Sequence, residues 1–93
     1  MTAPRISLEQ WRALVAVVDT GGYANAAEAL NKSQSTVSYA VRRIEELLGV
    51  ALFTIEGRKA VLTAAGRVLY RRARTLVEEA GRVEAAGAGL AGG

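Results

Sequence analysis

The feature that most constrains this chain is a pair of helical patterns separated by only three residues. Small and apolar side chains run from Ala24 to Leu30, and a second pattern covers 34–48 before it ends at Gly49. Glycine commonly follows the last turn of a helix. Only residues 31–33 lie between the patterns, and Ser33 is a favoured type for capping the second helix. We therefore predict two short helices joined by a tight turn.

The second of these helices, over 34–48, has two unlike faces. At about 100° per residue, one narrow stripe carries Val37, Val41, Ile44 and Leu48. The opposite face is polar and carries Gln34, Ser35, Ser38, Tyr39 and Arg42. Two helices joined by a tight turn, the second with a polar outer face, describe a helix-turn-helix.

A further helix precedes this pair, over about 8–19. Ser7 and Gln10 form a capping-box pattern at its start, and paired glycines at 21–22 favour a turn after it. Trp11 falls on the apolar stripe of this helix, so we interpret it as a core residue in preference to a binding residue.

After the helix-turn-helix, apolar residues no longer recur at helical spacing. Residues 51–55 and 59–62 are short extended candidates on either side of Glu56-Gly57-Arg58. They predict a small hairpin with a basic tip, a wing. The predicted fold is thus a mainly α winged helix-turn-helix over 6–63, with its helix-turn-helix at about 23–42.

A long helix is expected to follow, capped by Thr63 and covering about 64–88. Apolar residues recur along it every seven positions with alanines between them, which is typical of a seam between paired helices. The candidate dimerisation residues are Leu69, Ala73, Leu76, Ala80 and Val83. Residues 89–93 are rich in glycine and alanine, and we expect them to fray.

The residue types that are missing exclude several kinds of function. The chain has no cysteine and no histidine, which excludes disulfide scaffolds, zinc fingers, thiol nucleophiles and Ser-His-Asp triads. Its acidic residues are scattered, so we predict no catalytic residue, no cofactor and no metal ion. No apolar run approaches the roughly 20 residues of a membrane span. A cytoplasmic protein without a membrane partner is expected.

The charge is unevenly distributed, although the net charge is only +3. Between Lys32 and Arg74, nine basic side chains stand against three acidic ones, a local charge of +6. The rest of the chain holds three basic and six acidic residues, or −3. This asymmetry favours a polyanionic partner. Taken alone, it is equally typical of a solvated basic face.

The polar face of the helix over 34–48 carries side chains suited to the major groove of DNA. Gln34 can bond bidentately to adenine, Tyr39 offers a ring to a thymine methyl, and Arg42 suits guanine or phosphate. An ordinary solvated helix face is the alternative. A basic wing tip can contact phosphates or the minor groove, although charge at a hairpin tip also serves solubility. The candidate DNA-binding residues are Lys32, Ser33, Gln34, Ser35, Thr36, Ser38, Tyr39, Arg42, Arg43, Arg58 and Lys59.

Three stretches of the sequence occur in a recognisable order and spacing. They are Ala26-Ala27-Glu28-Ala29-Leu30 followed by Lys32-Ser33-Gln34-Ser35-Thr36-Val37-Ser38, then Ile44-Glu45-Glu46-Leu47-Leu48-Gly49-Val50-Ala51-Leu52-Phe53, and Leu62-Thr63-Ala64-Ala65-Gly66. Together they resemble the N-terminal DNA-binding domain of LysR-type transcriptional regulators. The resemblance covers about 6–66, and the linker helix extends it into the eighties.

The resemblance implies a bacterial, nucleoid-associated regulator that binds double-stranded DNA as a homodimer. Its recognition helix would be 34–48, and two chains would pair through the linker helix over 64–88. The residues that the resemblance places at the DNA are Gln34, Ser35, Ser38 and Tyr39, the last at a position that varies between members and so helps to choose the operator.

Two residues depart from the family pattern. Gly22 stands where a serine usually caps the following helix, so that helix is expected to begin less firmly. Ile55 stands where an arginine usually follows the Leu-Phe pair, and we expect it to pack inward. Such regulators also carry a longer C-terminal effector-binding region, which is expected to be absent here. A small-molecule effector would act only through that region.

Two other interpretations of the sequence stay open. The winged helix is also similar to the DNA-binding half of molybdate-responsive regulators, which keeps the DNA function. Alternatively, a protein-interaction module could keep the fold and assemble through the long helix. A DNA reader loses affinity steeply as salt rises, whereas an assembly module dimerises without preference for a DNA sequence.

Overall fold

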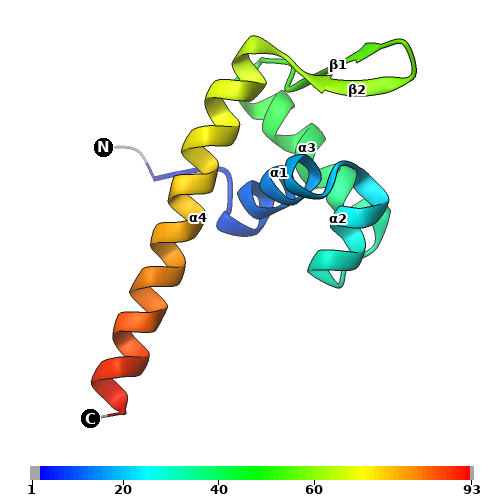
Figure 1. Cartoon of the computed structure of the whole chain (residues 1–93). Helices are drawn as coiled ribbons and strands as arrows, with labels where there is room; N and C mark the ends of the chain where they lie inside the picture. Colours follow the sequence, from blue (N-terminus) through cyan, green and yellow to red (C-terminus); the bar gives the residue numbers. More distant parts are fainter. Residues whose placement is uncertain (1–2, 93) are drawn as a thin grey trace.

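The computed structural model describes residues 3–92 and shows a small helical domain from which one long helix projects (Figure 1). The chain order of its elements is α1 (Leu8–Thr20), α2 (Tyr23–Leu30), α3 (Gln34–Leu48), β1 (Phe53–Glu56), β2 (Lys59–Leu62) and α4 (Ala64–Ala91). The prediction of a mainly α winged helix-turn-helix followed by a long helix is confirmed.

Helix α1 begins and ends as its local sequence predicts. The Ser7 hydroxyl accepts a hydrogen bond from the Gln10 amide at 3.2 Å, and the Gln10 side chain accepts one from the Ser7 amide at 2.9 Å. This reciprocal pair is a capping box. At the other end, Gly21 adopts φ 87°, a conformation that glycine reaches without steric cost.

The turn between α2 and α3 is held by backbone hydrogen bonds and a serine cap. Asn31 adopts a left-handed conformation with φ 56°, and the Lys32 amide donates to the Ala27 carbonyl at 2.9 Å. Ser33 then caps α3, because its hydroxyl accepts from the Thr36 amide at 3.1 Å. The start of α2 differs: Gly22 provides no side-chain hydrogen bond to that helix, as expected from the missing serine.

The core lies where the first three helices meet the start of the wing. Its largest fully buried side chains are Leu14, Val37, Val41, Ile44 and Leu52. Trp11 packs against this core, which confirms its interpretation as a core residue. The apolar stripe predicted for α3 is confirmed except at Leu48, whose side chain is 41% exposed. Leu48 lies in the last turn of α3, beyond the part of the stripe that other elements cover.

Strands β1 and β2 form an antiparallel hairpin in which Phe53 lies opposite Leu62 and Glu56 opposite Lys59. Strand β1 begins two residues later than predicted, because the Leu52 amide bonds to a side chain instead of the opposite strand. The Leu52 amide donates to the Glu45 carboxylate at 2.8 Å, and the Leu52 carbonyl accepts from the Thr63 amide at 3.0 Å. The Leu52 carbonyl thus still pairs across the hairpin, but the Leu52 amide is not available to the opposite strand.

Helix α4 packs against α1 in its first half and then leaves the domain (Figure 1). It extends to Ala91, past the predicted limit of 88, so residues 89–91 are helical and not frayed. The helical bond from the Gly92 amide to the Ala88 carbonyl, at 2.9 Å, continues the ladder, and alanine and leucine favour helix. Gly93, also expected to fray, lies outside the described residues. Across the described range, no helix is both long and apolar enough to cross a membrane.

Candidate nucleic-acid interface

The first turn of α3 is organised by hydroxyl groups. Besides capping the helix, the Ser33 hydroxyl lies 2.7 Å from that of Thr36 and 3.2 Å from that of Ser35. All three side chains are exposed. Ser33 and Thr36 are thus tied to each other, and this network fixes the direction in which the first turn presents its outer face.

The polar side chains next along α3 point away from the domain. Gln34, Tyr39 and Arg42 are exposed, Tyr39 by 56%. Within residues 3–92, none of these three side chains forms a hydrogen bond or ion pair with another residue. Ser38 is half-buried on the same face. The structure therefore brings the predicted base-reading residues together as one surface, on which Ser35 has a partner in the Ser33 hydroxyl and Gln34, Tyr39 and Arg42 have none in the described chain.

The two remaining cations of the helix-turn-helix lie at the flanks of this face. Lys32, in the turn, has its ammonium group 4.0 Å from a Glu9 carboxylate oxygen. Arg43 is half-buried, whereas its neighbour Arg42 is exposed. Side chains at both flanking positions are better placed to contact DNA phosphates than base edges, because the phosphates line the rim of the groove.

The wing tip carries the exposed cations Arg58 and Lys59. Gly57 turns the chain there with φ 64°. Ile55 was expected to pack inward, and this prediction is wrong, since its side chain is 67% exposed. The hairpin is only two strands wide, so the outer end of β1 has no core to face. The wing thus presents one apolar side chain behind its basic tip.

The base of the wing is locked to the start of α4 by Thr63. Its hydroxyl donates to the Ala51 carbonyl at 2.6 Å and accepts from the Gly66 amide at 2.9 Å. A Cβ atom added to Gly66 would come within 2.1 Å of the Leu52 carbonyl oxygen. The sequence predicts Thr63 as a helix cap but does not predict its bond to the Ala51 carbonyl or the close approach at Gly66. Both belong to the Thr63-Ala64-Ala65-Gly66 motif, in which the threonine makes the bonds and the glycine leaves room for the Leu52 carbonyl.

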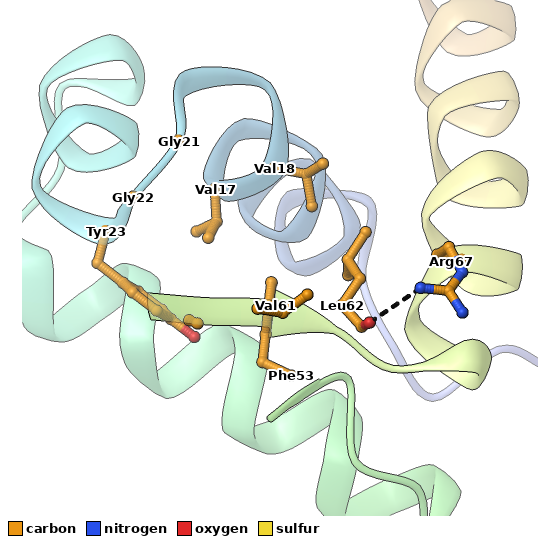
Figure 2. Close-up of a pocket in the computed structure, with 10 residues that line it drawn as sticks. Val17, Val18, Gly21, Gly22, Tyr23, Phe53, Val61, Leu62 and Arg67 are labelled. Atoms are coloured by element: carbon orange, nitrogen blue, oxygen red, sulfur yellow. Dashed lines mark hydrogen bonds between the residues drawn. The ribbon is translucent and has the colours of Figure 1, made fainter. Parts of the chain in front are cut away.

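A hollow of about 350 Å³ lies between the α1–α2 turn and the hairpin (Figure 2). The rings of Tyr23 and Phe53 lie 6.3 Å apart along it, and the Arg67 guanidinium donates to the Leu62 carbonyl at 3.2 Å. Burial, followed by the negative charge of Glu45, raises the pKa of the Tyr23 hydroxyl. The other walls are aliphatic or glycine, so the hollow offers no set of convergent catalytic groups.

The five predicted dimerisation residues divide into two groups. Ala73 is 3% exposed, so it is not available to a partner, and the half-buried Leu69 packs against the core of its own chain. The sevenfold pattern did not distinguish contacts within the chain from contacts between chains. Leu76 is 47% exposed, Val83 is 64% exposed and Ala80 is half-buried, and they form an apolar stripe on the projecting part of α4.

The residues described by the structure contain no group of three or more histidine, cysteine, aspartate or glutamate side chains that could hold a metal ion.

Comparison with family models gives one decisive result: residues 8–67 match the bacterial regulatory helix-turn-helix protein, lysR family. The chain belongs to the LysR family. The resemblance seen in the sequence is confirmed, and the molybdate-responsive alternative is replaced by this assignment. Residues 8–67 are the helix-turn-helix domain of a LysR-type protein.

Curated relatives of this LysR-family chain are transcriptional regulators. A probable nitrogen assimilation transcriptional activator of Synechococcus elongatus is 43% identical over 72 residues, covering 77% of this chain and 23% of that protein. The probable regulator YhaJ of Escherichia coli is 35% identical over 88 residues, covering 95% of this chain and 30% of that protein. The chain thus spans about a quarter of the length of such relatives.

Solved structures of LysR-type proteins have the same fold. The BenM DNA-binding domain in complex with catB site 1 DNA matches with a TM-score of 0.85 and 28% identity, over 94% of this chain and 98% of that chain. Oxidised OxyR of Corynebacterium glutamicum matches with a TM-score of 0.87 and 29% identity, over 99% of this chain and 28% of that chain.

Proposed function

We propose that this chain binds double-stranded DNA in a sequence-specific manner for a bacterial transcriptional regulator. The observation that carries the proposal is the outer face of α3, where Gln34, Tyr39 and Arg42 are exposed without partners in the described chain. Side chains of these types pair with base edges and phosphates. The likeness to the BenM domain, which was solved with DNA, supports the same use of the fold here.

Sequence would be read from α3 in the major groove. Gln34, Ser35, Ser38 and Tyr39 would contact base edges, and each good bidentate contact discriminates by about 1–3 kcal/mol. Phosphates would be held by the remaining candidates on the groove rim, the first turn of α3 and the wing: Lys32, Ser33, Thr36, Arg42, Arg43, Arg58 and Lys59.

The chain would act as a homodimer that pairs through α4. Leu76, Ala80 and Val83 supply the exposed apolar stripe for pairing. The two copies of α3 would then face major grooves about 34 Å apart, or a multiple of that distance. Such a regulator would work in the bacterial cytoplasm on the nucleoid. Any small-molecule effector would bind outside the residues of this chain.

Selection from randomised duplex DNA at moderate salt, followed by sequencing, tests this function. A dimeric reader should enrich an inverted repeat with an interrupted centre. Enrichment of one half-site alone would support sequence-specific DNA binding and contradict binding as a dimer. Retention that falls with salt but enriches no sequence would contradict sequence-specific binding and favour an assembly module instead.

A further inference from the structure

The direction of α4 relative to the winged helix depends on its contact with α1. One polar contact joins the two: the Tyr70 hydroxyl of α4 donates to the Asp19 carboxylate near the end of α1, at 2.5 Å. Among hydrogen bonds between residues 3 and 92, it is the single side-chain bond that links these two helices. The residues are 51 positions apart in the chain, so the bond fixes tertiary geometry.

The rest of the α1–α4 contact is apolar, and further along α4 the side chains of Leu76 and Ala80 line a shallow hollow together with Trp11 of α1. Ala73 is the buried α4 side chain at this contact, and Leu69 packs beside it. An alanine allows the helices to approach closely but imposes no direction, because apolar packing is not directional. A hydrogen bond weakens steeply when its angle changes. The Tyr70–Asp19 bond therefore resists rotation of α4 about the Ala73 contact.

The Tyr70 hydroxyl keeps its proton at neutral pH, although the nearby Arg74 acts to lower the pKa of that hydroxyl. The hydrogen bond to Asp19 is the main cause of a raised pKa for the Tyr70 hydroxyl, so the hydroxyl remains a donor. Arg74 lies one turn further along α4 and its Nε atom is 3.6 Å from a Glu78 carboxylate oxygen. The cluster thus holds a tyrosine, two acids and a cation on one side of α4.

Small rotations at this contact have large effects at the dimer stripe. Val83 lies roughly 20 Å beyond Tyr70 along the helix, at 1.5 Å per residue. A tilt of about 10° at the contact would move Val83 sideways by roughly 3 Å over that length. The residues at 81–92 are all exposed, so the angle is set by the contacts that α4 makes up to Ala80, and among these the Tyr70–Asp19 bond is the directional one.

We propose that the Tyr70–Asp19 bond is a latch that fixes the angle of α4 and so selects the spacing between DNA half-sites. Tyr70 and Asp19 are then positioning residues that touch no DNA. The inference rests on the proposed dimeric DNA binding. The latch holds the two recognition helices at one separation, so that an operator with a different centre length is bound less well.

Half-site spacing is the first measurement. Duplexes with two fixed half-sites and a centre of varied length would be selected with the unmodified chain, Tyr70→Phe, Asp19→Ala and the double variant. We expect the unmodified chain to enrich a narrow set of lengths, and each variant to shift or broaden that set by at least one base pair. The double variant should do no more than either single one, because both remove the same bond.

A matched control separates the latch from general changes in α4. Thr75→Ala removes an α4 hydroxyl that donates only within the helix, to the Arg71 carbonyl at 3.2 Å, and should leave the spacing unchanged. All variants should keep the same half-site sequence. An unmodified chain that selects half-sites but accepts every centre length equally would overturn the latch while leaving DNA reading intact.

A distance measurement tests the latch without DNA. The chain has no cysteine, so spin labels can be placed at Glu28→Cys on α2 and Ala85→Cys on α4, both exposed positions. Labelled chain diluted with unlabelled chain reports the distance within one copy. Tyr70→Phe should widen or shift the distance distribution. An unchanged distribution would overturn the latch even if DNA binding itself had failed.

Discussion

Gly66 shows how one residue can set the joint between the wing and the long helix. A Cβ atom added to Gly66 would lie only 2.1 Å from the Leu52 carbonyl oxygen, closer than two such atoms can approach. Gly66→Ala should therefore destabilise the domain by about 1–3 kcal/mol, because a backbone atom cannot turn aside as a side chain can. Chemical denaturation followed by circular dichroism would measure this loss.

Another glycine of the same helix provides the control. Gly81 has no atom within 4 Å of an added Cβ, so Gly81→Ala should stabilise α4 by roughly 0.5–1 kcal/mol through its higher helix propensity. If both alanines stabilised the chain, the close approach at Gly66 would not limit the fold.

Arg42 illustrates the residue scale at the DNA face. It is exposed and forms no ion pair in the described part of the chain. Arg42→Ala should weaken binding to all sequences and lower the slope of log K against log salt by about 0.9 per half-site, one phosphate contact. Arg82→Ala is the matched control, because Arg82 pairs with Glu79 at 3.1 Å, far along α4. If the two variants gave the same slope of log K against log salt, Arg42 would not contact a phosphate.

At the scale of elements, α2 differs from the other three described helices in that no side chain caps its start. Gly22 has extended backbone angles, φ 171° and ψ 169°, and open space for a side chain. Gly22→Ser should therefore add a cap and stabilise the domain by a few tenths of a kcal/mol, about 0.3. Thermal and chemical denaturation would show it.

The adjacent glycine should respond in the opposite direction. Gly21 has φ 87°, and Gly21→Ser should cost about 1 kcal/mol because a Cβ atom is strained in left-handed conformations. Stabilisation by both serines would mean that the α1–α2 turn adapts, and that the capping argument does not hold.

Helix limits could be predicted where they depend on local chemistry. The caps by Ser7, Ser33 and Thr63 follow from hydroxyl groups that each bond the amide three residues later in the chain, so the local sequence is enough to predict them. The start of β1 could not be predicted, because it depends on a Glu45 carboxylate seven residues earlier in the chain. The exposure of Leu48 likewise depends on which elements cover the end of α3.

The candidate site divides in the same way. A helical wheel predicts the exposed face of α3, since its outer residues differ from the buried stripe in type. It does not predict that Ala73 is buried against α1 within one chain. An apolar repeat shows that a helix face is covered, but not whether its own chain or a second copy covers it.

At the scale of the whole molecule, pairing of two chains should depend on the exposed stripe of α4. Val83 is 64% exposed, so Val83→Asp should leave each chain folded and able to bind one half-site, while dimerisation and binding to two half-sites are lost. Analytical ultracentrifugation and binding to single and double sites would measure this.

Two other positions make that experiment specific. Ala85→Asp introduces the same charge about 200° around the helix from Val83 and should change neither property. Leu69→Asp would be uninformative, because Leu69 packs against the core of its own chain and its loss would unfold the domain. If Val83→Asp stayed dimeric, pairing would use another surface.

The modest size of the exposed stripe also has a consequence for dosage. Between 76 and 83 the stripe consists of Leu76, Ala80 and Val83, of which one is an alanine. If this chain pairs through these side chains, its dimer forms as the number of copies rises, since the stability of such a dimer cannot be separated from protomer concentration. Occupancy of a two-part operator would then climb more steeply than in proportion to copy number, and a cell could use abundance alone as a threshold.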